Sequence, residues 1–158
     1  MAKKYDSEKF VNDVTSYMKQ HLNTYIDHIN LEKDDGMIID SIADEAYIFQ
    51  TLDDKVVNHS PCVFYYIDDI VSEGIGPETS EQVMLDIVII MSDPKDGSLA
   101  FRLLRYLRAL KELFNEGFNS LNYSKKINIE SLVPVSFALQ NSSDYVHAIG
   151  VRLTTTII

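Results

Sequence analysis

The strongest constraint on the fold comes from residues 80–117, where an alternating apolar pattern is followed at once by a helical one. Over residues 83–91 every second side chain is apolar, which predicts a strand with one face in the core. Val88 and Ile90 make the opposite face half apolar, so we expect the strand over 80–91 to be internal in its sheet. The residues of the first face are Val83, Leu85, Ile87, Ile89 and Met91.

A helix is predicted over residues 98–116, directly after the turn-forming residues 93–97 (DPKDG). Its apolar residues recur at intervals of three and four, so they form one stripe that can pack against the sheet. Asp96 or Ser98 can cap its first turn, and Gly117 stands where a glycine commonly ends a helix. The stripe consists of Leu99, Leu103, Tyr106, Leu107, Leu110, Leu113 and Phe114.

The segments before residue 80 predict a second helix, a second strand and, over residues 46–49 (AYIF), a short segment that fits either a strand or a helical turn. Residues 7–31 have helical apolar spacing with Asp6 or Ser7 as N-cap, and residues 62–71 are β-branched and aromatic, as in a buried strand. Residues 34–61 are acidic and irregular, so we expect a flexible or partner-ordered loop region there.

The segments after residue 117 predict a hairpin. Residues 126–139 and 144–157 alternate, and Pro134 marks an edge, a bulge or a break because proline cannot donate to a strand ladder. The predicted fold is therefore one α+β domain over residues 1–158. It has a mainly antiparallel sheet of about four to five strands, with two long helices packed on it, in the order α-β-β-β-α-β-β.

Composition excludes several classes of protein. The 158-residue chain has 46% hydrophobic residues and a net charge of −10, which indicates a globular chain without the basic face of a general nucleic-acid binder. A single cysteine, Cys62, allows no disulfide within the chain and favours a reducing compartment. The polar start predicts no signal peptide, and no apolar run is long enough for a membrane span.

The chain lacks the residue patterns of the common catalytic and metal sites. His21 and His28 share a helix face without a zinc spacing, and the strand carboxylates Asp68, Asp69 and Asp86 lack the lysine of a nuclease site. Residues 74–77 (GIGP) lack the lysine and helix of a phosphate loop, and no G-x-S-x-G elbow is present. We therefore expect no enzyme, no cofactor and no metal ion.

The one concentrated basic patch recurs every third residue along the second predicted helix. A solvated flank paired with local acids explains this pattern, and so does a subunit contact with the acidic 34–54 region of a neighbour. The candidate contact residues are Arg102, Arg105, Arg108 and Lys111 with Asp34, Asp35, Asp44, Glu45, Asp53 and Asp54.

The order of elements resembles that of the tail terminator proteins of tailed bacteriophages, within the broader group of neck and tail-completion proteins. The local sequence pattern is also similar in three segments, the strand VMLDIVIIMSD, the helix FRLLRYLRALKELFNE and the closing strand YVHAIGVRLTTTII. The resemblance covers most of the chain by element order, and residues 34–61 have no clear counterpart.

The resemblance implies a homo-oligomeric ring, expected to be a hexamer, that caps the tail tube, stops its polymerisation and joins the tail to the head connector. The implied partners are the chain itself, the tail tube protein and the head–tail connector protein, and DNA only passes through the lumen. Such a protein is assembled in the host cytoplasm and resides in the virion, with no membrane involved. The candidate docking loop is Glu73, Gly74, Ile75, Gly76, Pro77 and Glu78.

Two other functions fit the same residues. One is a different neck or head-completion protein, which would also form a ring but would dock on the portal side. The other is a small acidic inhibitor of the immunity type, which would bind a basic partner without forming a ring.

Overall fold

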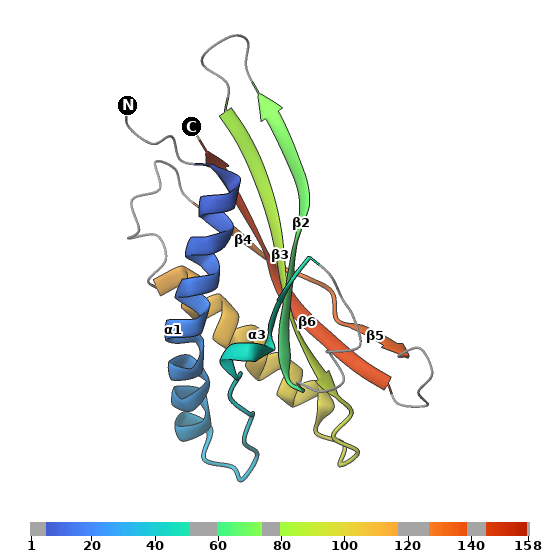
Figure 1. The fold of residues 1–158 in the computed structure, drawn as a ribbon. Helices are drawn as coiled ribbons and strands as arrows, with labels where there is room; N and C mark the ends of the chain where they lie inside the picture. Colours follow the sequence, from blue (N-terminus) through green and yellow to red (C-terminus); the bar gives the residue numbers. More distant parts are fainter. Residues whose placement is uncertain (1–5, 51–59, 74–79, 117–126, 139–144, 158) are drawn as a thin grey trace.

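The computed structural model describes residues 6–50, 60–73, 80–116, 127–138 and 145–157. Figure 1 shows two helices on one face of a curved sheet. The helices are α1 (Ser7–Lys33) and α3 (Leu99–Glu116), and a short 3₁₀ turn, η1 (Asp44–Ala46), precedes the first strand. The strands are β1 (Tyr47–Phe49), β2 (Cys62–Glu73), β3 (Ser80–Ser92), β4 (Asn128–Ser131), β5 (Val135–Ala138) and β6 (Tyr145–Ile157).

The sheet has six strands in the order β1-β2-β3-β6-β4, and β5 also pairs with β6. Strand β1 runs parallel to β2, and the other pairings are antiparallel. The two strands of 13 residues, β3 and β6, lie side by side at the centre, as the two apolar faces of β3 predict. The predicted α+β class and mainly antiparallel sheet are confirmed.

The predicted final hairpin differs from the structure in one respect. Its first arm is divided into β4 and β5, which both pair with β6 and are separated by residues 132–134. Leu132 still donates its N–H to the carbonyl of Gly150 at 2.8 Å, whereas Pro134 has no N–H to donate. The break allowed for at Pro134 is therefore what occurs, and it adds a strand to the predicted order.

The core lies between the helices and the face of the sheet that they cover. Helix α1 begins at its N-cap Asp6, whose side chain accepts a hydrogen bond from the N–H of Lys9 at 2.8 Å, and its C-cap Asp34 has a left-handed backbone. Most of the apolar stripe of each helix is buried, with Leu99 and Leu107 of α3 only partly buried, together with residues of β3 and β6. The largest fully buried side chains are Phe10, Met18, Leu22, Ile26, Ile29, Ile39, Ile42, Leu85, Ile87, Ile89 and Phe114.

Candidate functional site

The basic series on α3 lies beside the acidic segment 34–46, and two of its arginines, Arg102 and Arg105, bind that segment of their own chain. Arg105 is only 7% exposed, donates a hydrogen bond to the Met37 carbonyl at 2.6 Å and forms an ion pair with Asp35. Arg102 donates to the Ile38 carbonyl and to Ser98 Oγ, both at 2.7 Å. The hydrogen bond from Arg105 holds the pKa of the Asp35 carboxyl below its ordinary value.

The other two members of the basic series are more exposed. Arg108 forms ion pairs with Glu32 on α1 at 2.5 Å and with Glu112 on α3 at 2.7 Å. These hydrogen bonds raise the pKa of Arg108, so it stays charged at every ordinary pH. Lys111 is exposed on the same helix. The pairing of arginines with acids that the sequence predicts therefore occurs within one chain, and a role in subunit contact stays a prediction.

Two asparagines on α1 bind the same segment from its other side. Asn30 donates to the carbonyl of Ile39 and accepts from its N–H, both at 3.0 Å. Asn23 makes the same pair of hydrogen bonds with Ile42, at 2.9 and 2.8 Å. Because each amide satisfies both backbone groups of one residue, it replaces the partner strand that this extended segment lacks. Residues 37–42 therefore pack onto both helices without any second chain.

The remaining candidate contact residues divide into exposed and undescribed ones. Asp34, Asp44 and Glu45 are exposed, and no arginine of α3 binds them. Asp53 and Asp54 lie outside the described residues, so their part in the predicted contact and the flexible-loop prediction for residues 51–59 stay open. The docking loop also lies outside, apart from the backbone of Glu73 at the end of β2.

The face of the sheet opposite the helices has a charged cluster at its centre. Arg152 on β6 donates two hydrogen bonds to Asp86 on β3, at 2.7 and 3.1 Å, and one to Asp68 on β2 at 3.0 Å. Asp86 is only 2% exposed, so its charge is buried and balanced by one guanidinium. Burial, together with the nearby Asp86 carboxylate, raises the pKa of Tyr66 on the same face. Two of the three carboxylates considered for a nuclease metal site, Asp68 and Asp86, thus bind an arginine instead.

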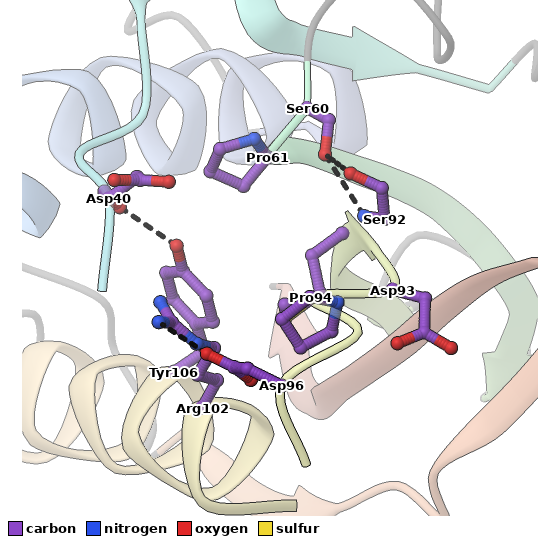
Figure 2. A pocket seen from close by; sticks show the side chains of 10 residues that line it. Asp40, Ser60, Pro61, Ser92, Asp93, Pro94, Asp96, Arg102 and Tyr106 are labelled. Atoms are coloured by element: carbon purple, nitrogen blue, oxygen red, sulfur yellow. Dashed lines mark hydrogen bonds and ion pairs between the residues drawn. The ribbon is translucent and has the colours of Figure 1, made fainter. Parts of the chain in front are cut away.

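A cavity of about 240 Å³ lies where segment 34–46, the end of β3 and the start of α3 meet (Figure 2). Tyr106 donates to the carbonyl of Asp40 at 2.9 Å across one wall. On the opposite wall, Ser60 Oγ accepts the N–H of Ser92 at 3.0 Å and shares a hydrogen bond with the Ser92 hydroxyl. These polar groups bind one another, and the carboxylate residues Asp93 and Asp96 also line the cavity. No cluster of three metal-ligating side chains occurs in the part of the chain that the structure describes.

A serine on β5, a histidine on β6 and an aspartate just after β3 lie next to one another. Ser136 Oγ and His147 Nδ1 share a hydrogen bond of 2.6 Å, and His147 Nε2 lies 3.6 Å from a carboxylate oxygen of Asp93. Sequence reasoning missed this group, although alternation across the final hairpin places residues 136 and 147 opposite each other. Of these three residues, Asp93 lines the cavity of Figure 2, whereas Ser136 and His147 do not.

We predict that the Cys62 thiol is unreactive in the folded protein. Cys62 is fully buried at the start of β2, and burial raises the pKa of its thiol to about 12. Because the thiolate is the reactive form, labelling by a disulfide reagent at pH 8 should be at least about a hundredfold slower in native protein than in urea. A fast native reaction would show that β2 opens at this end.

No protein-family model matches the chain, and no curated protein matches it. Neither of the described helices combines the length and the apolar content required to cross a membrane.

Proposed function

We propose that this chain is a structural virion protein of a tailed bacteriophage. In this proposal it is a tail terminator that forms a ring, caps the tail tube and presents a surface to the head connector. The proposal starts from the resemblance in the order of elements and in local sequence pattern, and it involves no catalysis. A neck or head-completion protein with the same subunit architecture is the nearest alternative.

The observation that best supports the proposal is the charge on the open face of the sheet. Cross-strand pairing places Asp68, Asp69, Asp86 and Glu130 on the face that α1 and α3 leave uncovered, with Arg152 as the cation bound among them. A ring built with this face toward its lumen would repel a DNA backbone at short range. DNA could then pass through without binding to the wall.

The first test is the absolute mass in solution by light scattering, at low and at moderate salt. A ring is expected to give about six times the chain mass of 18.0 kDa, and electron microscopy should then show a central hole. A particle that dissociates as salt rises would indicate ion pairing between subunits. A monomer that also fails to bind the end of isolated tail tubes would contradict the proposal.

A charge reversal tests the basic flank of α3. Arg105 is a poor choice because it is buried and binds its own chain, so its loss would also disturb the fold. Lys111 is exposed, and we expect Lys111→Glu to weaken ring assembly by roughly tenfold if the flank meets acids of a neighbour. Lys95→Glu, in the exposed turn before α3, is the matched control and should leave the mass unchanged. Equal masses for wild type and both variants would remove this flank from the interface.

The inhibitor function is favoured by one specific feature. Asp34, Asp40, Asp44 and Glu45 are all exposed along the segment that α1 and α3 hold in place. An ordered row of acids could match a basic protein surface. A persistent monomer that captures a basic partner through these residues would support this function over the ring.

A further inference from the structure

We propose that the open edge of β2, with the apolar groove beside it, binds an extended segment of a different protein as an added strand. The segment would alternate apolar and basic residues. This inference goes beyond the proposed ring and does not depend on it.

Among the residues that the structure describes, only part of the edge of β2 is covered. Strand β1 pairs with β2 at Val63, Phe64 and Tyr65, and β2 continues to Glu73. Figure 1 shows this second half of β2 at the margin of the sheet, with β3 on its inner side. No other described strand pairs with β2 there. The exposed backbone groups of such an edge can bind an incoming strand.

Gln50 marks where the added strand would begin. Its N–H donates to the carbonyl of Tyr65 at 2.9 Å, and its side-chain oxygen accepts the N–H of Ile67 at 3.0 Å. The side chain thus takes the place of a next strand residue. These hydrogen bonds also show that the backbone groups of Tyr65 and Ile67 point away from β3, toward the open side.

An apolar groove of about 370 Å³ adjoins this edge on the helix side of the sheet. Phe49 and Ile67 contribute its sheet wall, and Val11 contributes apolar surface from α1. Thr15 donates to the Tyr65 hydroxyl at 2.8 Å and so ties the helix to the strand at the groove. Phe49 is 40% exposed although its ring lies 5.2 Å from that of Tyr65. A groove of this size accepts one or two aliphatic side chains.

Charge specifies the other face of the added strand. The β2–β3 register shifts between Ile67 and Asp69, and the exposed Asp68 and Asp69 lie on the face away from the helices. Side chains of a strand alternate between faces, so a strand with apolar residues in the groove presents its other residues beside these acids. Lysine or arginine at those positions would be attracted by them.

The same acids argue against a second copy of this chain as the occupant. None of the described strands contains a lysine, and their one arginine, Arg152, lies in the central strand β6 and already binds Asp86 and Asp68. The opposite edge of the sheet presents Glu130 on β4, which Asp68 and Asp69 would repel. Acids on an edge strand also discourage pairing between identical edges.

The experiment is a binding titration of the full chain with a labelled peptide of about nine residues in which valine and lysine alternate. The controls are a peptide of the same composition with its lysines in one block, and one that alternates valine and glutamate. We expect the first peptide to bind at least tenfold more tightly than either control. Equal binding of all three peptides would overturn the proposal.

Three variants then test the location. Ile67→Pro removes the outward N–H at a position that an edge strand tolerates, and it should abolish binding. Gln50→Gly should tighten binding several-fold, because it frees that N–H and glycine suits the backbone φ of 70° at this position. Asp69→Lys should weaken binding by roughly tenfold, with Asp27→Lys, at an exposed acid of α1, as the neutral control.

Circular dichroism of each variant shows whether the fold is kept. If Ile67→Pro fails to fold, the opposite effects of Gln50→Gly and Asp69→Lys still decide the question. If neither Gln50→Gly nor Asp69→Lys changes the affinity for the peptide, the proposal is overturned. The chain could instead associate with itself and thereby block peptide binding. If Asp69→Lys abolished that self-association, the occupant of the edge would be a second copy of the chain, and this result would also overturn the proposal.

Discussion

Replacing Gly150 with alanine is expected to destabilise the fold by about 3 kcal/mol or more, or to prevent folding. Gly150 lies in β6 opposite Val88 of β3, at the centre of the sheet. A Cβ there would lie 1.9 Å from the carbonyl oxygen of Ile87 and 2.7 Å from the Cα of Val88. Both atoms belong to the backbone of a central strand, so neither can move aside without disrupting the ladder.

The measurement is urea unfolding followed by circular dichroism, with Gly97→Ala as the control. Gly97 has a φ of 79° but open space around its Cα, so alanine there costs only backbone strain, about 1 kcal/mol. The comparison separates the steric contact between β3 and β6 from the general loss of a glycine. Equal effects of the two substitutions would contradict the close approach of these strands.

The second large effect is expected from Arg152→Leu, which should lower the free energy of unfolding by about 3–5 kcal/mol. The substitution removes the only cation that binds Asp86 among the described residues and leaves that carboxylate buried without a countercharge. The hydrogen bonds to Asp86 raise the pKa of Arg152, so the pair stays charged at any ordinary pH.

A double substitution tests this explanation. Asp86→Leu combined with Arg152→Leu removes both charges and should recover most of the lost stability, because the unpaired charge and not the missing attraction is the main cost. Asp68→Asn removes the exposed partner of Arg152 and should change stability by less than about 1 kcal/mol. If the double variant is as unstable as Arg152→Leu alone, the lost stability comes from side-chain packing and not from an unpaired buried charge.

The fold class and most elements could be predicted because they depend on local periodicity. The stripe from Phe10 to Ile29, the alternation over residues 83–91 and the stripe of α3 each specify a buried face within one segment. Pro134 similarly marked the break between β4 and β5, because its missing N–H is a property of the residue itself. Strand β1 stands in the predicted order, but residues 46–49 fitted either a strand or a helical turn, since three residues are too few to show a period, and its parallel pairing with β2 was not predicted.

The candidate sites were less accessible from sequence because they depend on which distant segments meet. The spacing of the arginines identified a basic flank, but only the packing of residues 34–46 against α3 shows that Arg105 binds Asp35 of its own chain. Asn23 and Asn30 gave no sequence signal, because an amide that binds a backbone needs only that backbone nearby.

Local chemistry thus specified which residues are buried and where each helix and most strands lie along the chain. Long-range packing specified the partners: Asp86 with Arg152 across two strands, Gly150 against Ile87, and the open edge of β2 beside α1. The physical reason is the sequence separation over which each interaction acts. A hydrophobic period acts within one element, whereas an ion pair, a close backbone approach or an uncovered edge exists only after elements far apart in sequence have been brought together.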